Sequence, residues 1–167
     1  GVLNNESKTS WATQVGYTQP NYSVSAIVNM KYNGWTDEYF QTADGFARDG
    51  DGNSTNIGLR AWWRPTDSEN ALPSISVGYD TSETDATSNS NTTAYFVGLN
   101  WADVLNPDDK IGVAFGQPQK KEGETVDPFL YEVYYKYQVN DSVSITPTIF
   151  GGTSKNASGT ETDMTGY

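Results

Sequence analysis

Apolar and polar residues alternate with a period of two along most of the 167-residue chain. The clearest run covers 22–33, where Tyr22, Val24, Ala26, Val28, Met30 and Tyr32 share one face. Alternation of this kind is typical of antiparallel strands with one apolar side. Eight strands are predicted from it, at 11–18, 22–33, 56–64, 74–81, 93–101, 110–117, 129–139 and 143–150.

The connections between these predicted strands alternate between shorter and longer segments. The shorter ones are 19–21, 65–73, 102–109 and 140–142, and the longer ones are 34–55, 82–92, 118–128 and 151 onward. Short turns at one end and long loops at the other favour an all-β, transmembrane antiparallel up-and-down β-barrel. Within the connections, a short helix is expected at 36–41 and one helical turn at 102–105.

Composition changes this picture only in part. Hydrophobic residues make up 35% of the chain, mean hydropathy is -0.63 and the formal net charge is -11. Aromatic residues nevertheless reach 13%, which favours a folded all-β protein over a disordered acidic chain. No apolar run approaches the roughly 20 residues of a membrane-spanning helix, but transmembrane strands need only about 10 alternating residues.

Charged residues are distributed unevenly between the strands and the connections. Of 21 acidic residues, only Asp80 and Glu132 fall inside a predicted strand. Charges inside the predicted strands all occupy the polar face, and we interpret them as lining a water-filled lumen because a charge facing lipid costs about 2–4 kcal/mol. These pore-lining candidates are Lys31, Arg60, Arg64, Asp80, Glu132 and Lys136, with Lys110 at a strand edge.

Aromatic residues on the apolar face gather toward the strand ends, as expected of an aromatic girdle at the two membrane–water boundaries. The girdle candidates are Trp11, Tyr17, Tyr22, Tyr32, Trp63, Tyr79, Trp101 and Tyr137. The same aromatic residues would also suit a secreted acidic β-sandwich, such as a carbohydrate-binding module that stacks sugars on exposed rings. That alternative stays open at the level of sequence.

Four segments resemble the C-terminal part of the barrel in the cyanobacterial branch of the carbohydrate-selective porin family. They are GLRAWWRP at 58–65, PSISVGYD at 73–80, VGLNWADVLNPDDKIGVAFGQP at 97–118 and YEVYYKYQVNDSVSITPTIFGG at 131–152. The resemblance covers 56–152 well, and the first 50 residues by character more than by motif.

This resemblance implies an outer-membrane porin that passes inorganic ions and small hydrophilic solutes, including sugars in some relatives. Family members are usually homotrimers and attach to peptidoglycan through an N-terminal surface-layer-homology domain. They lie among outer-membrane lipid and lipopolysaccharide. Two departures are expected here: the surface-layer-homology domain is absent, and the apolar alternation of a terminal strand fails at Glu161, Asp163 and Thr165. Residues 1–167 are therefore interpreted as the C-terminal portion of a larger, 16-stranded barrel.

Catalytic and cofactor chemistry finds little support in the residues. The chain has no cysteine and no histidine, which removes disulfides, thiolate nucleophiles, His-dependent triads and most zinc sites. No cofactor is expected. The run DGDGN at 49–53 lacks the downstream glutamate of a calcium loop, so a plain acidic turn is expected. The net charge of -11 disfavours nucleic acid as a partner.

Overall fold

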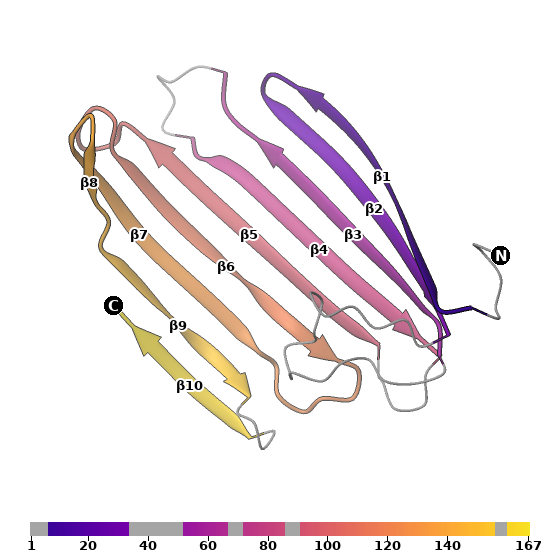
Figure 1. The fold of residues 1–167 in the computed structure, drawn as a ribbon. Helices are drawn as coiled ribbons and strands as arrows, with labels where there is room; N and C mark the ends of the chain where they lie inside the picture. The colour runs from indigo at the N-terminus through magenta and orange to yellow at the C-terminus, as the bar shows by residue number, and fades with distance from the viewer. Residues whose placement is uncertain (1–6, 34–51, 67–71, 86–90, 156–159) are drawn as a thin grey trace.

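The computed structural model describes residues 7–33, 52–66, 72–85, 91–155 and 160–167. These residues form one antiparallel sheet in which strands follow one another in sequence order (Figure 1). The strands are β1 (Thr9–Gln19), β2 (Tyr22–Tyr32), β3 (Ser54–Trp63), β4 (Ser74–Thr84), β5 (Thr92–Ala102), β6 (Lys110–Lys121), β7 (Phe129–Asn140), β8 (Val143–Ile145), β9 (Thr148–Lys155) and β10 (Glu161–Gly166). The all-β, up-and-down organisation predicted from sequence is confirmed.

The number of strands differs from the prediction of eight. The last predicted strand, 143–150, is divided into β8 and β9, which pair with successive parts of β7. Pro147 lies at the break because proline has no N–H to donate to a ladder. The segment with broken alternation, Glu161–Gly166, was not counted as a strand and forms β10 against β9.

Register pairing joins the apolar positions of neighbouring strands into continuous rows. One row runs from Tyr17 through Val24, Ala61, Val77, Val97 and Phe115 to Tyr131. The intervening positions form parallel rows of mostly small or polar residues, such as Ser25, Arg60 and Gly78. A shift of one residue would exchange the two faces, so the alternation in sequence excludes registers that differ from this one by an odd number of residues.

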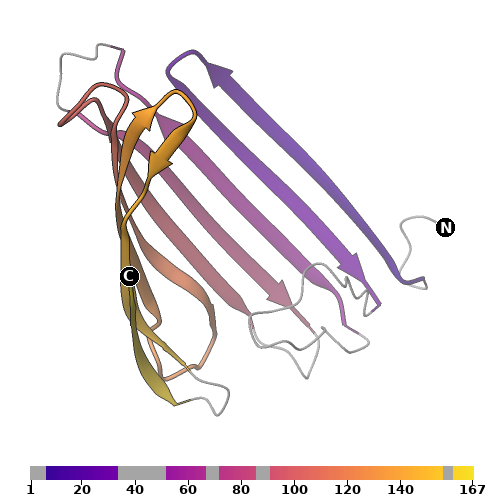
Figure 2. The same cartoon turned by 60° about the vertical axis from the view of Figure 1, so that its left-hand side comes forward.

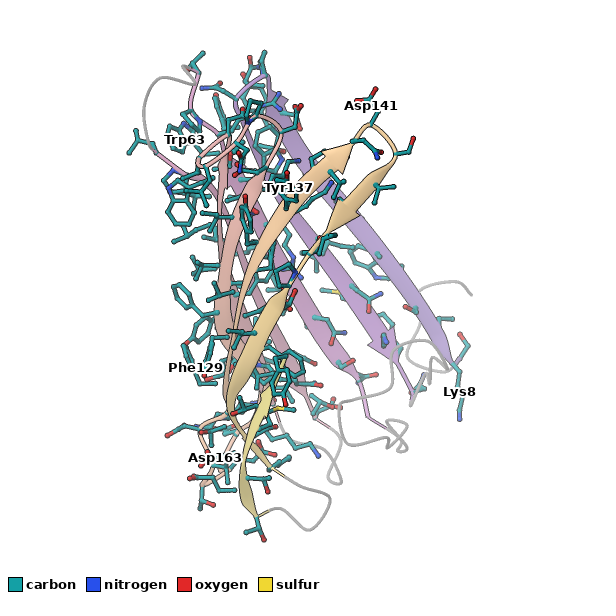
Figure 3. All side chains as sticks on the ribbon, turned by 90° about the vertical axis from the view of Figure 1, so that its left-hand side faces the viewer. Lys8, Trp63, Phe129, Tyr137, Asp141 and Asp163 are labelled. Atoms are coloured by element: carbon teal, nitrogen blue, oxygen red, sulfur yellow. The ribbon has the colours of Figure 1, made fainter. Side chains whose placement is uncertain are left out.

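The sheet is curved, with the apolar rows on its convex side. Figure 2 shows the curvature, and Figure 3 shows Trp63 and Phe129 projecting from the outer side of the curve. β1 and β10 are the two edges of the sheet and do not pair with each other. The second, packed sheet that a β-sandwich requires is not present in the described part of the chain.

Side-chain burial is unlike that of a globular domain. Val126 is the single buried hydrophobic side chain among the described residues, at 7% exposure. Large apolar side chains on the convex side are instead exposed, for example Val15 at 71% and Ile149 at 58%. The described sheet therefore has no interior hydrophobic core of its own.

Turns at the two ends of the sheet differ from the predicted alternation of lengths. The short turn at 20–21 joins β1 to β2 and the turn at 141–142 joins β7 to β8, both at the same end. However, β4 extends to Thr84 and β6 to Lys121, so the connection 85–91 is shorter than the connection 64–73 at the opposite end. The prediction that shorter and longer connections alternate strictly was wrong, because polar residues extend β4 and β6 beyond their apolar rows.

The β5–β6 connection is not the predicted helical turn at 102–105. The buried carboxylate of Asp109 organises it by accepting hydrogen bonds from the backbone N–H groups of Val104, Leu105 and Asn106. Asp103 and Asp108 adopt positive φ angles of 56° and 66°. The helix predicted at 36–41 and most of the DGDGN run lie outside the described residues.

Candidate functional site

The concave face of the sheet is the candidate functional site because it carries the polar alternate positions of every long strand. Serine, asparagine, threonine and glycine dominate it from β1 to β6. Asn29, Asn56 and Ser82 form a hydrogen-bonded ladder across β2, β3 and β4, with Ser82 Oγ donating to Asn56 Oδ1 at 2.6 Å. Hydrogen-bonding side chains therefore cover this face in place of an apolar layer.

Arg60 and Asp80 are brought together near the middle of the concave face. The guanidinium Nη2 of Arg60 lies 2.8 Å from Asp80 Oδ2, and the Arg60 guanidinium lies 5.6 Å from the centre of the Phe96 ring. Both charged side chains keep close to half of their surface exposed. The pair thus presents opposite charges side by side and contributes little net charge.

Arg64 has a different environment from the one expected of a pore-lining residue. It lies one residue beyond β3, and its Nε and Nη2 atoms donate to the Pro20 carbonyl at 2.8 and 2.6 Å. Its guanidinium also lies 5.4 Å from the Trp62 ring centre. Placing Arg64 inside a strand was wrong, since its role here is to tie the end of β3 to the β1–β2 turn.

The other predicted pore-lining residues are distributed along the concave face. Lys31 lies on β2 opposite Ser10 and Ser54, near the end of the sheet with the longer loops. Glu132 is exposed on β7 between Ala114 and Phe150, and forms no ion pair with a described residue. Lys136 lies directly opposite Lys110 at the short-turn end.

Sequence reasoning missed several strand charges. Glu83, Lys120, Lys121, Lys155, Glu161 and Asp163 all lie inside strands. Glu83 shares the convex face with Val77 and Tyr79, so the rule that every strand charge occupies the polar face was wrong. Most of these charges lie beyond the apolar rows, whereas Asp163 is on the convex face in the register row of Thr153 and Phe129.

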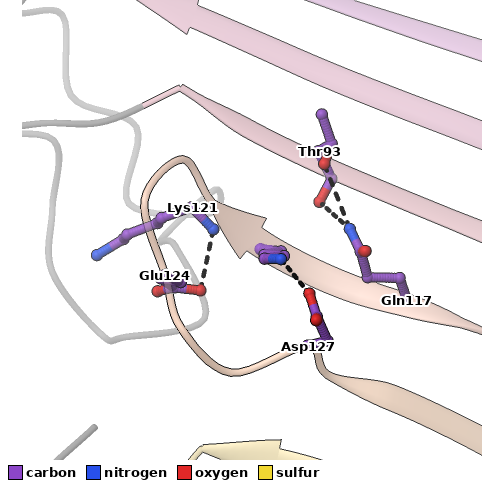
Figure 4. A network of polar contacts seen from close by, with 6 residues as sticks. Thr93, Gln117, Lys121, Glu124 and Asp127 are labelled. Atoms are coloured by element: carbon purple, nitrogen blue, oxygen red, sulfur yellow. Dashed lines mark hydrogen bonds and ion pairs between the residues drawn. The ribbon is translucent and has the colours of Figure 1, made fainter.

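Polar contacts stabilise the strands at the end of the sheet where β6 is connected to β7 (Figure 4). Lys120 forms an ion pair with Asp127, and the backbone N–H of Lys121 donates to Glu124 Oε2 at 3.0 Å. Gln117 Nε2 donates to Thr93 beside the irregularity in the β5–β6 register. The sheet is therefore longer than its apolar band.

A shallow apolar depression of about 470 Å³ interrupts the polar character of the concave face. Phe96, Leu130, Phe150 and Met164 line it, with Asp80 and Glu132 at its margin. Phe150 and Met164 were not predicted to face the same surface as Phe96. Their positions follow from the pairing of β9 with β10, which the broken alternation concealed.

The predicted girdle residues all belong to the convex rows, but Tyr79 is in the middle of β4, so its placement toward a strand end was wrong. Tyr17 and Tyr22 pack together at the β1–β2 turn, with ring centres 6.1 Å apart. Trp63, Trp101 and Tyr137 lie toward the same end, whereas Trp11 and Tyr32 lie toward the other end. Tyr17, Tyr22, Trp63, Tyr79 and Tyr137 are exposed.

Metal and helix-based alternatives receive no support from the described residues. They contain no cluster of three or more acidic side chains placed to hold a metal ion. No helix within them is long and apolar enough to cross a membrane. Comparison of the chain with protein-family models, curated proteins and solved structures returned no match.

Proposed function

We propose that this chain forms part of an outer-membrane β-barrel whose concave face lines a water-filled path for inorganic ions and small hydrophilic solutes. The observation that carries the proposal is that the apolar side chains of the sheet are exposed on its outer side and do not pack in an interior core. Exposed apolar residues cover the convex side, polar residues and glycine make up most of the concave side outside its apolar depression, and the described residues hold almost no core. Lipid against the convex side would remove that apolar surface from water.

The dimensions of the apolar band support this proposal. Tyr22 and Tyr32 are ten residues apart on β2, or about 33 Å along the strand, which becomes about 25 Å for a strand tilted by about 40°. Outer-membrane barrels carry an apolar band about 25 Å tall between aromatic girdles. The convex aromatic residues at the two ends fit the girdle positions. By the same comparison, the short-turn end would face the periplasm.

Closure of the barrel requires further pairing at β1 and β10. β8 and β9 succeed one another along β7, so the ten strands make nine crossings of the sheet. Bacterial single-chain barrels close with an even number of antiparallel strands. We therefore retain the interpretation that these residues are a portion of a larger barrel. The trimer, the sugar transport and the peptidoglycan attachment implied by family resemblance remain predictions.

A carbohydrate-binding β-sandwich is less well supported. It would require a second sheet packed over the aromatic face, and the described strands form one sheet. Its exposed rings are spread over the whole convex side among valine, leucine and isoleucine, where a sugar would meet few polar partners.

The proposal can be tested by measuring how a thiol reagent changes the current through variants with single introduced cysteines. These 167 residues contain no cysteine, so the reagent has no native thiol to modify among them. Val113 and Ala114 are neighbours on β6 that lie on the convex and concave faces respectively. The full-length protein that contains these residues would be reconstituted in planar bilayers as the wild type and as Val113→Cys and Ala114→Cys. A charged, membrane-impermeant thiol reagent should reduce the current of Ala114→Cys and leave Val113→Cys unchanged. Absence of conductance in the wild type, or equal modification of both variants, would overturn the proposal.

A further inference from the structure

Two lysines face each other directly on the concave side, near the end of the sheet with the short turns. Lys110 on β6 is the register partner of Lys136 on β7. Both lie on the face that carries Ala114 and Glu132. Directly opposed residues have Cβ atoms about 4.5–5.5 Å apart, so the two lysine side chains extend from one small area of this surface and their ammonium groups can reach the same ligand.

Acidic side chains do not compensate this pair. Neither lysine forms an ion pair with a described residue. Asp109 precedes Lys110, but its carboxylate is fully buried and bonds to Tyr135, whose side chain belongs to the convex face. Glu132 is four residues from Lys136, about 13 Å along the strand. Asp103 and Asp108 lie in the connection that precedes Lys110, but neither forms an ion pair with Lys110 or Lys136. The two positive charges are therefore not neutralised by an ion pair with a described acidic side chain.

A hydrogen-bond donor lies beside the lysines. Asn100 is two positions along the same concave face, across Gly112 from Tyr134. The Tyr134 hydroxyl lies 2.5 Å from Asn100 Oδ1 and donates to it. This bond occupies the acceptor of Asn100, while its amide nitrogen forms no hydrogen bond with a described residue. The surroundings of the pair thus offer positive charge and an amide donor.

We propose that Lys110 and Lys136 form a binding site for a tetrahedral oxyanion in solution, of the phosphate or phosphomonoester class. Directly opposed like charges destabilise a sheet, and a dianion that accepts hydrogen bonds from both ammonium groups offsets that repulsion. The site rests on the proposed function, because it would lie on the solute path near its periplasmic end. The proposed site would make oxyanions one class of solute that passes along this path.

Equilibrium dialysis of the detergent-solubilised full chain against radiolabelled inorganic phosphate tests the site without requiring a current. The net charge of -11 keeps nonspecific phosphate binding low. Lys110→Gln and Lys136→Gln should each weaken binding at least fivefold, and the double variant more than tenfold. Lys110→Arg/Lys136→Arg, which keeps both charges, should bind within threefold of the wild type. Lys31→Gln, at the other end of the same face, is the matched control and should bind as the wild type does.

Planar-bilayer recordings then separate the site from the pore. Saturable reduction of chloride current by phosphate, lost in the double glutamine variant, supports both proposals. A pore with no phosphate binding overturns the oxyanion site alone. Binding that depends on both lysines, in a full-length protein that conducts no current, supports the site and overturns the pore. Dialysis in the presence of short-chain phosphatidic acid distinguishes lipid headgroups, and stronger competition by that lipid than by unlabelled phosphate would overturn the solute assignment.

Discussion

The Tyr135 hydroxyl donates a hydrogen bond to the buried carboxylate of Asp109, with 3.0 Å between Tyr135 Oη and Asp109 Oδ2. Three backbone N–H groups in the same connection bond to this carboxylate. Desolvation raises the pKa of Asp109, and the hydrogen bonds to Asn106, Tyr135, Val104 and Leu105 outweigh it, so the pKa falls below its ordinary value. One ionised side chain therefore holds the β5–β6 connection together.

Because its pKa is lowered in the folded state, Asp109 stabilises the connection at pH values above its ordinary pKa of 3.8. That stabilisation is lost as pH falls through the lowered value. Tyr135→Phe removes one donor, so the folded pKa should rise and the connection should open at a higher pH. Hydrogen exchange of the Leu105 and Asn106 amides, followed from pH 7 downward, measures this opening. Tyr137→Phe is the control, and an equal change in that variant would contradict the assignment.

Asp109→Asn should open the same connection at neutral pH. The amide retains one oxygen acceptor, but it places an NH2 group where Asp109 now accepts from backbone N–H donors. Exchange of the Leu105 amide should be faster in Asp109→Asn than in Asp108→Asn, since the N–H of Asp108 donates to Asp103 while its own carboxylate is not part of this set. Equal exchange in the two variants would refute the central position of Asp109.

The Arg60–Asp80 pair should matter more for ion selectivity than for stability. Both side chains are close to half exposed, and exposed pairs of this kind contribute about 0–1 kcal/mol. Arg60→Gln leaves Asp80 unpaired and should shift the reversal potential toward cation preference, whereas Asp80→Asn should shift it toward anion preference. The double variant should lie close to the wild type. Shifts of the same sign in both single variants would be inconsistent with a neutral pair on the solute path.

A lysine substituted on the convex face of β4 should destabilise the protein more than a lysine substituted on the concave face. Val77 lies on the convex side between Ala61 and Val97, and Ser76 next to it lies on the concave side. Val77→Lys should destabilise the lipid-inserted protein by about 2–4 kcal/mol, because its charge would face the middle of the apolar band. Ser76→Lys should cost less than about 1 kcal/mol. Urea titrations in lipid vesicles measure both, and similar losses would argue against lipid on the convex side.

Gly116 allows a close approach of the β5 backbone beside the register irregularity. A Cβ at this position would lie 2.1 Å from the Tyr95 carbonyl oxygen. Gly116→Ala should therefore force the strands apart and cost about 1–3 kcal/mol, as overpacking does. At Gly16 the same methyl group would lie 3.5 Å from the nearest atom, so Gly16→Ala is a matched control that should be nearly neutral. Unfolding titrations in detergent compare them, and equal stabilities would contradict this account.

Sequence periodicity predicted most of the sheet because each face has its own solvent requirement. The residues from Tyr22 to Tyr32 and those from Phe129 to Tyr137 were placed on the correct faces by alternation alone. Periodicity did not predict β10, because Glu161, Asp163 and Thr165 place polar side chains at the positions where the other strands carry apolar ones. It also gave no sign of the Asp109 connection, which depends on hydrogen bonds to a single carboxylate.

The candidate site was predicted less completely than the sheet. The faces of Arg60 and Asp80 follow from alternation, but their contact depends on the β3–β4 register. The same is true of Lys110 and Lys136, which are 26 positions apart in sequence and become direct neighbours through the β6–β7 pairing. Register depends on turn geometry and on bulges such as the one beside Tyr95, and neither is visible in the period of two.

The up-and-down order of the strands has a consequence for how the molecule is assembled. Each strand pairs only with segments next to it along the chain, so every interface joins neighbouring hairpins. Such a sheet can lengthen by adding one strand at a time, and each addition closes a loop between segments that are adjacent in sequence. Strand pairing would then proceed in sequence order. A backbone clash at one strand would prevent its pairing with the next strand and stop the growth of the sheet at that point.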